Sequence, residues 1–242
     1  MYGQDFQVEV VTVESPLRDA ARLAAESLTV ADHANGLARL AICGELPEGF
    51  LLQLRLRLAG NDADASPSNV WTRIRMTWID ELCVPASDLR SRRGGVARSG
   101  MLATKYRVGY ELPLYLDGEQ PEQAVTRFEL CFAEHFAGGL DVAVIDLGTA
   151  LALATPSDPR ALVQRSTTGD GLERLALSAQ IVADAQLLVV VAHGRSAAEA
   201  LALLRARSVD VRRRGPGVIY VVSDTPSGEL HLGDTQPGAA PA

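Results

Sequence analysis

Two acidic residues in succession, Asp80 and Glu81, follow the apolar segment Arg-Ile-Arg-Met-Thr-Trp-Ile. Carboxylates at such a position can serve as a general base or orient one, because their protonation responds strongly to burial and to neighbouring groups. The alternative is structural: Asp80 accepts hydrogen bonds from loop amides and preserves the turn at the end of a strand. Both interpretations place the acidic pair where a strand ends.

His193 closes the apolar run Leu-Leu-Val-Val-Val-Ala and precedes Gly194. Histidine is the side chain best suited to proton transfer near neutral pH, so His193 could act as a base. A single histidine at a strand end also occurs simply as a residue with satisfied hydrogen bonds. Cys43 could be a nucleophile only beside an activating base. The sequence reveals no such base, which favours a buried thiol.

Four arginines surround a Gly-Gly pair in the middle of the chain: Arg90, Arg92, Arg93 and Arg98. Guanidinium groups pair well with phosphate, so this loop could clamp an anionic ligand. It could equally be a solvated loop that offsets the charge of an acidic protein. Lys105 is the only lysine in the chain, so an anionic ligand bound anywhere else would have to pair with arginine. Arg195 could supply a further positive charge.

Several function classes have no support in the sequence. We find no glycine-rich dinucleotide or nucleoside triphosphate motif, no zinc-ligand spacing and no serine-hydrolase motif, so we expect no cofactor and no metal. The formal net charge of −7 argues against nucleic-acid binding. No apolar run approaches the ~20 residues of a membrane span, and three widely spaced cysteines suit a reducing compartment. We therefore expect a cytoplasmic protein without nucleic-acid or membrane partners.

Strand and helix patterns alternate along the chain. The expected strands are residues 6–13, 37–43, 73–79, 140–145, 174–177, 187–192 and 218–222. The expected helices are residues 17–35, 47–58, 121–136 and 196–207, with a short helix inside the loop at 85–105. Near-continuous apolar strands separated by helices predict a three-layer α/β/α fold with a mostly parallel, Rossmann-like sheet.

This pattern predicts one α/β domain over residues 1–224 and a flexible tail over 225–242, where the composition falls to Gly, Pro, Ala and Thr. In such folds ligands bind beyond the carboxyl ends of the strands. The segments that we expect at this edge are residues 43–47, 80–85, 146–149 and 193–195.

The segment Trp78-Ile79-Asp80-Glu81-Leu82-Cys83-Val84-Pro85, with Ser91 six residues on, resembles the W-x-D-E-R-C-V-P…S-N motif of 6-phosphogluconolactonases. That family is related to glucosamine-6-phosphate isomerases. Weaker matches follow in the same order over roughly residues 6–224. They are the loop at 40–47, the strand and turn at 140–150, the strand at 174–177, the helix start at 194–201 and the last strand with Asp224.

The resemblance implies a lactonase that opens a sugar lactone in the oxidative pentose phosphate pathway. In the family, the histidine of a G-H-T-A-S turn activates water, and the arginine of D-E-R-C steadies the developing negative charge. Here Gly148 precedes Thr149-Ala150 after a shortened turn, and Leu82 replaces the arginine. The phosphate-binding loop keeps Gly44 but carries Cys43, Glu45 and Leu46 in place of hydroxyl residues, and a carboxylate there repels phosphate.

These departures predict a lactonase-like protein whose activity is lost or much reduced; the alternative is a non-catalytic protein that binds a sugar phosphate or a partner protein. If the chain is active, Asp80 and His193 must replace the missing catalytic groups. The residues that would then bind the substrate are Gly44, Ser91, Arg92, Arg93 and Arg195. The family's helix-start lysine is Ala197, so Arg195 would have to provide that charge.

Overall fold

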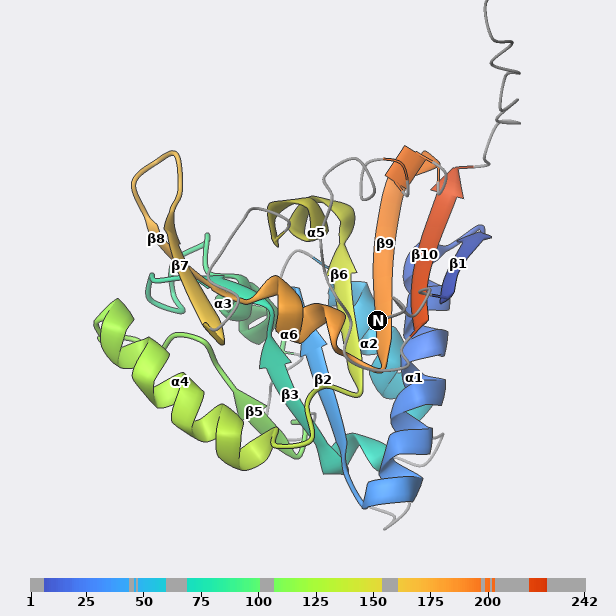
Figure 1. Cartoon of the computed structure of the whole chain (residues 1–242), viewed down its shortest axis with the longest axis horizontal. Helices are drawn as coiled ribbons and strands as arrows, with labels where there is room; N and C mark the ends of the chain where they lie inside the picture. The colour runs from blue at the N-terminus through green and yellow to red at the C-terminus, as the bar shows by residue number, and fades with distance from the viewer. Residues whose placement is uncertain are drawn as a thin grey trace, which may run out of the picture.

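The computed structural model describes residues 7–43, 46, 48–59, 69–100, 107–153, 161–196, 199–200, 202 and 218–225. Seven strands form one sheet in the order β1-β10-β9-β6-β2-β3-β5, and every neighbouring pair is parallel (Figure 1). They are β1 (Gln7–Thr12), β2 (Ala38–Ile42), β3 (Ile74–Trp78), β5 (Tyr110–Leu112), β6 (Val142–Asp146), β9 (Leu187–Ser196) and β10 (Val218–Thr225). The expected α/β class with a parallel sheet is confirmed.

Helices lie on both sides of this sheet. They are α1 (Pro16–Asn35), α2 (Glu48–Leu58), α3 (Arg92–Arg98), α4 (Pro121–His135), α5 (Leu147–Leu153) and α6 (Ala179–Ala183), with a 3-10 turn η1 at Val70–Arg73. In Figure 1, α2 lies behind the sheet and α6 in front of it. Among the helices in these ranges, none is both long and apolar enough to cross a lipid bilayer.

Helix α1 shows how local sequence sets an element. Pro16 occupies its first turn, and Gly36 ends it with a left-handed backbone at φ 71°, donating its N–H to the Asp32 carbonyl at 2.7 Å. The buried face of α1 consists mainly of alanines and packs against the strands. Small side chains allow a helix and a sheet to approach closely, so α1 covers several central strands.

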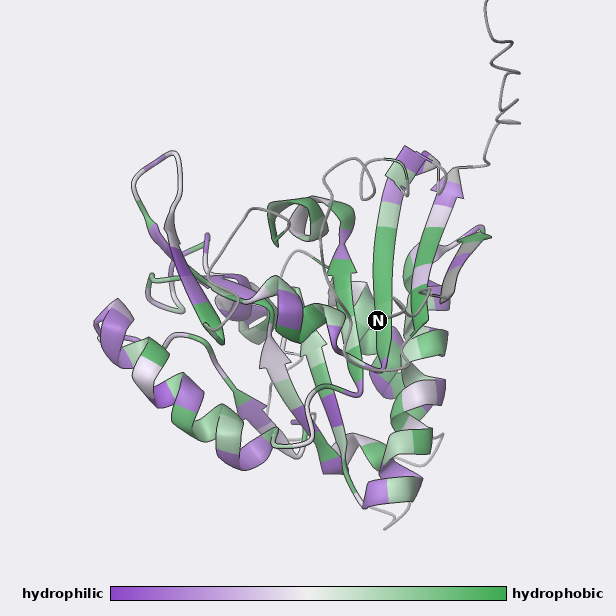
Figure 2. Cartoon of the chain, in the orientation of Figure 1, coloured by the Kyte–Doolittle hydropathy of each residue, from purple (hydrophilic) through white to green (hydrophobic). Residues whose placement is uncertain are grey.

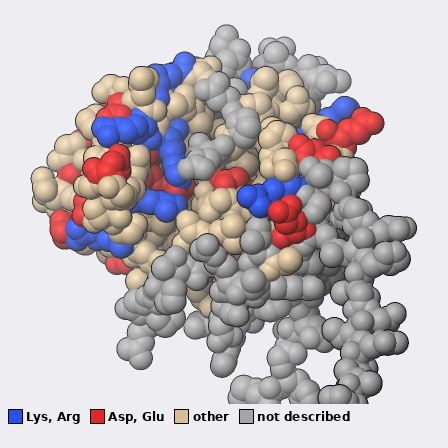
Figure 3. Space-filling view, turned by 90° about the horizontal axis from the view of Figure 1, so that it is seen from above, with Lys and Arg blue, Asp and Glu red and all other residues tan. Residues whose placement is uncertain are grey.

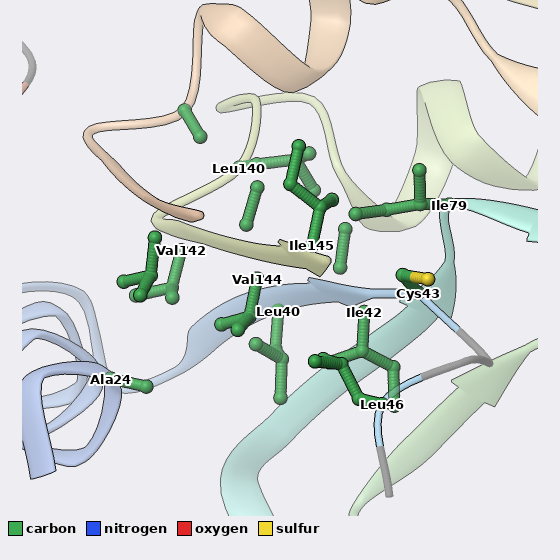
Figure 4. Close-up of a cluster of buried hydrophobic side chains, with 14 of the residues drawn as sticks. Ala24, Leu40, Ile42, Cys43, Leu46, Ile79, Leu140, Val142, Val144 and Ile145 are labelled. Carbon is green, nitrogen blue, oxygen red and sulfur yellow. The ribbon is translucent and has the colours of Figure 1, made fainter. Parts of the chain in front are cut away.

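The core lies between the helices and the central strands. β2 and β6 contribute fully buried Leu40, Ala41, Val142 and Val144, and Figure 4 shows these strands side by side with their apolar side chains gathered together. Figure 2 shows hydrophobic colour along β6, β9 and β10, whereas α4 alternates between hydrophobic and hydrophilic residues. A sheet that is buried on both faces reads as continuous apolar runs, as the sequence indicated.

The strand expected at 174–177 is confirmed as β8 (Glu173–Leu177), but it lies outside the parallel sheet. It pairs antiparallel with β4 (Asp80–Leu82) and β7 (Val163–Thr167) in a second, three-stranded sheet. Ser196 was expected to begin a helix over 196–207, and that start is wrong. Ser196 belongs instead to β9, because β10 extends far enough for Thr225 to pair with it, and helical residues are described only at 199–200 and 202.

A buried ion pair fixes the end of α1 to η1. Arg73 donates from Nε and Nη2 to the two carboxylate oxygens of Asp32 at 2.7 and 2.6 Å, in a two-pronged arrangement. The Asp32 side chain is almost fully buried. The hydrogen bonds from Arg73 lower the pKa of Asp32 below its usual value of 3.8, although burial opposes the shift.

Replacing Asp32 by asparagine should lower the free energy of unfolding at pH 7 by about 1–3 kcal/mol, because it removes charged hydrogen bonds. The pKa of Asp32 is lowered in the folded state, so this contribution is complete above the unfolded value near 3.8 and is lost as the pH falls through the folded pKa. Urea unfolding of both proteins between pH 7 and pH 3 measures the difference, which should shrink below pH 4. In the control Glu26→Gln, which removes an exposed pair with Arg22, we expect a change of about 0.5 kcal/mol or less. An equal loss in both variants would contradict the prediction.

Candidate functional site

The strand order reverses between β2 and β6. From β2 the chain continues to β3 and β5 on one side, whereas from β6 it continues to β9 and β10 on the other. Connections that leave two neighbouring parallel strands in opposite directions open a crevice at their carboxyl ends, where α/β proteins bind their ligands. Cys43 follows β2 and Asp146 ends β6, so both lie at this point.

Asp146 is the centre of a hydrogen-bond network at this point. Its Oδ2 accepts bonds from the Cys43 thiol at 2.8 Å and from the Thr149 hydroxyl at 2.7 Å, and its Oδ1 accepts the Thr149 N–H at 2.9 Å. Burial alone would raise the pKa of Asp146, but the bonds from Cys43, Thr149 and the Gly148 backbone outweigh burial and lower it. Asp146 is thus held as a carboxylate by groups of the chain itself.

This network gives Cys43 a structural role. Its sulfur is buried, lies 3.1 Å from the Thr149 hydroxyl and donates to Asp146. A sulfur that donates a hydrogen bond is a thiol, whereas nucleophilic attack requires the thiolate. All three cysteines lie in described parts of the chain, and none of them forms a disulfide.

Asp80 is the first residue of β4, shortly after the end of β3, and its side chain is fully buried. Its Oδ2 accepts bonds from Arg174 Nε at 3.1 Å and Nη2 at 2.6 Å, and the Arg92 guanidinium pairs with the same oxygen. β8 carries Arg174 directly opposite Leu82, and Leu82 shares a face of β4 with Asp80, which explains why Arg174 reaches it. Asp80 therefore holds two guanidinium groups and not the loop amides that the sequence suggested.

Glu81 holds the start of α3. Its Oε1 accepts the N–H groups of Leu82 at 2.8 Å and Arg92 at 3.0 Å, and its Oε2 accepts the N–H of Arg93 at 2.7 Å. Ser91 caps the helix by accepting the Gly94 N–H at 2.9 Å. Burial raises the pKa of Glu81 although these backbone bonds oppose it. The acidic pair thus fixes the arginine-rich loop to the sheet.

Most arginines of this loop are already engaged. Arg93 pairs with Glu111 at 2.7 Å, Arg90 pairs with Asp88 at 2.7 Å, and Arg98 donates to the carbonyls of Ala86 and Asp88. Figure 3 shows the same pattern from above, with basic and acidic side chains interspersed on the part of the surface that is described. The loop does not present four arginines together as an anion clamp.

His193 lies at the other side of the edge, near the end of β9. Its Nδ1 is 2.7 Å from Asp224 Oδ2, and its side chain is 72% exposed. Gly194 donates its N–H to the other oxygen of Asp224 at 2.9 Å. Arg195 pairs with Glu199 at 3.1 Å, and both of these side chains are exposed.

The residues singled out from the sequence thus form two separate groups. Asp80, Ser91, Arg92 and Arg93 gather around β4 and α3, whereas His193 and Arg195 lie on β9. Two strands separate β9 from β3, so these two strands lie roughly 14 Å apart at spacings of ~4.8 Å, and the two groups belong to different parts of the edge. Gly44 lies outside the described residues.

The sequence analysis assigned no site role to three further residues: Asp146, Arg174 and Asp224. Asp146 ends β6 and Asp224 lies one residue before the end of β10, and those positions could have drawn attention to them. Arg174 gave no such signal, because its role depends on the pairing of β8 with β4. Within the described residues, no group of three or more His, Cys, Asp and Glu side chains could hold a metal ion.

A comparison with models of protein families matches residues 12–217 to a family described as glucosamine-6-phosphate isomerases/6-phosphogluconolactonase. No curated protein sequence matches the chain. Similar solved structures include 6-phosphogluconolactonases from three organisms. The one from Shewanella baltica has a TM-score of 0.67 at 16% identity, covering 91% of this chain and 99% of that one. Those from Thermotoga maritima and Trypanosoma brucei have TM-scores of 0.68 and 0.62 at 14% and 15% identity, covering 90% of this chain and 100% and 97% of theirs. At identities this low, the structural similarity shows a shared fold and nothing more.

Gly94→Ala should destabilise the protein, because a Cβ at Gly94 would lie 2.1 Å from the Ala86 carbonyl oxygen. The start of α3 must then shift, and we expect the free energy of unfolding to fall by about 1–3 kcal/mol. Gly95→Ala in the same helix is the matched control, since its Cβ would lie 3.8 Å from the nearest group. Alanine favours a helix, so we expect Gly95→Ala to be neutral or stabilising by up to ~1 kcal/mol. Urea unfolding checks both values, and similar effects of the two substitutions would contradict the close approach at Gly94.

Thr149→Val should lower the free energy of unfolding by about 1–3 kcal/mol, because it removes a charged hydrogen bond from a buried network. It should also raise the pKa of Asp146, since the lost bond is one of those that lower it. The carbon chemical shift of the Asp146 carboxyl, followed against pH, measures the second effect. Thr126→Val is the control on the exposed surface of α4, and we expect it to leave Asp146 unchanged. An unchanged Asp146 titration in Thr149→Val would show that the hydroxyl contributes nothing.

Proposed function

The chain belongs to the glucosamine-6-phosphate isomerase/6-phosphogluconolactonase family, and on that premise we propose that it is a 6-phosphogluconolactonase-like protein whose lactone hydrolysis is lost or much reduced. The reaction in question adds water to 6-phosphogluconolactone and gives 6-phosphogluconate, a step of the oxidative pentose phosphate pathway. We propose that the protein resides in the cytoplasm. No cofactor enters this chemistry.

The observation that carries the proposal is the closed network of Asp146, Cys43 and Thr149. β6 passes directly into α5, and Gly148 lies in the first turn of that helix, where the resemblance would put a catalytic histidine. A Cβ at Gly148 would stand 3.0 Å from Asp146 Oδ1, so a larger side chain would press on the network. The groups at the switch point satisfy one another, and this supports the loss of a base there.

The second missing group is the cation at position 82. Leu82 occupies β4 opposite Arg174 of β8, and both Arg174 and Arg92 are paired with Asp80. A carboxylate between two guanidinium groups neutralises part of their charge, so they stabilise a developing oxyanion less well than an arginine pointed at it. This arrangement supports reduced stabilisation of the transition state.

Typical losses from these two changes are large. A missing general base costs about 10²–10⁴ in rate, and a missing oxyanion donor costs about 10²–10³. The two losses do not multiply simply, because both groups act on one transition state. Either loss alone would lower the rate of lactone hydrolysis far below that of an ordinary lactonase.

The same closed network supports one alternative, a non-catalytic protein that binds a sugar phosphate or a partner protein. A scaffold can keep a binding surface after it has lost its proton-transfer group, because binding needs no base. The alternative predicts that 6-phosphogluconate binds while the lactone is not turned over. Calorimetry with 6-phosphogluconate, combined with a measurement of lactone turnover, separates the two functions from each other.

We expect the purified protein to open 6-phosphogluconolactone at least 10²-fold more slowly per active site than the Thermotoga maritima 6-phosphogluconolactonase, because a base is missing. Ring opening releases an acid, so titration at constant pH follows it against the spontaneous rate. A rate that matches the Thermotoga enzyme would overturn the proposal. Absence of both turnover and 6-phosphogluconate binding would overturn the family substrate as the ligand of this protein.

A further inference from the structure

The ladder between β9 and β10 is interrupted near its end. Ala192 pairs with Ser223, and the next pair along joins Ser196 to Thr225. Between these pairs β9 has three residues, His193, Gly194 and Arg195, whereas β10 has only Asp224. The extra residues of β9 must bulge away from the sheet, and bulges of this kind often redirect a side chain beside a site.

The bulge is held by side chains from β10. Asp224 accepts the Gly194 N–H at 2.9 Å with one oxygen and contacts His193 Nδ1 at 2.7 Å with the other. Ser223 donates its hydroxyl to the Arg195 carbonyl. Gly194 has φ 67°, a left-handed conformation that glycine adopts without strain. The position of the imidazole is therefore determined by the backbone and by one carboxylate.

This contact fixes which nitrogen of His193 can accept a proton. When neutral, the imidazole carries its hydrogen on Nδ1, where Asp224 accepts it, and the lone pair then resides on Nε2. The side chain is 72% exposed. A carboxylate that orients an imidazole in this way is a recurring arrangement for general-base catalysis.

His193 also lies next to the switch point. Val191 is the residue of β9 that pairs with Asp146, and His193 follows two residues later, at the start of the bulge. His193 thus lies at the carboxyl edge of the sheet, on the strand next to the one that Asp146 ends. Arg195 belongs to the same bulge and pairs with Glu199. It therefore places a guanidinium group near the same end of β9 as His193.

We propose that His193, oriented by Asp224, is the proton-accepting group for the lactone hydrolysis that this protein retains. The choice of substrate rests on the proposed function. Nε2 takes a proton from water as the water oxygen bonds to the lactone carbonyl carbon. The bond from that carbon to the ring oxygen then breaks, and Nε2 returns the proton to the released oxygen. The products contain the lactone plus one water, and Asp224 stays ionised as a positioning residue.

The test compares the full-length protein with His193→Gln, Asp224→Asn and the control His33→Gln, which changes an exposed histidine at the end of α1. Each is added at high concentration to 6-phosphogluconolactone, and ring opening beyond the spontaneous rate is measured. We expect His193→Gln to abolish that acceleration and His33→Gln to leave it unchanged. Asp224→Asn should lower kcat with little change in KM, because Asp224 acts through the imidazole.

A second measurement does not depend on turnover. The ¹⁵N chemical shifts of the histidine rings report which nitrogen carries the hydrogen. At alkaline pH we expect His193 to be protonated on Nδ1 in the wild-type protein and to lose this preference in Asp224→Asn. An Nε2-protonated ring in the wild type would overturn the proposed orientation.

The outcomes separate this inference from the proposed function. If the wild type gives no acceleration, or if a weak acceleration survives in His193→Gln, the role of His193 is overturned while the proposed loss or reduction of lactonase activity stands. If the wild type matches the Thermotoga enzyme and His193→Gln abolishes the activity, the role of His193 is supported and the loss of activity is overturned.

Discussion

The carboxylate of Asp146 joins the ends of two neighbouring parallel strands at the point where their connections diverge. It accepts a hydrogen bond from the Cys43 thiol, which follows β2. It also accepts hydrogen bonds from the hydroxyl and the N–H of Thr149 in the first turn of α5. A buried carboxylate requires such partners, because an unpaired charge in the interior is strongly unfavourable. The chain satisfies this requirement with its own polar groups, at the point where β6 passes directly into α5.

The same requirement shapes the region around β4. Asp80 and Glu81 are both buried, and each is satisfied differently: Asp80 by guanidinium groups, Glu81 by backbone amides at the start of α3. These contacts tie the arginine-rich loop and the second sheet to the first. Residues that resemble catalytic groups in the sequence are thereby used to hold the architecture, and the exposed imidazole of His193 is at a different strand end.

The fold was largely predictable, because buried parallel strands produce apolar runs such as 187–192 that can be recognised without structural information. Element boundaries and sheet membership were less so. Residues 174–177 read as a strand, yet their antiparallel pairing with β4 depends on a contact between segments more than ninety positions apart. Ser196 likewise was expected to begin a helix, a local preference that its long-range pairing with Thr225 overrides.

For the candidate site, the sequence by itself determined which groups exist: a glycine at 148, a leucine at 82, and a histidine that closes an apolar strand. Residue type sets the chemistry that a position can perform, and this is fixed before folding. Only the tertiary structure decided which groups are engaged and which face solvent. Asp224 meets His193 because two parallel strands pair with unequal numbers of residues, and Arg174 meets Asp80 because two sheets adjoin. Such meetings depend on the distances between strands in space, which the order of residues along the chain does not specify.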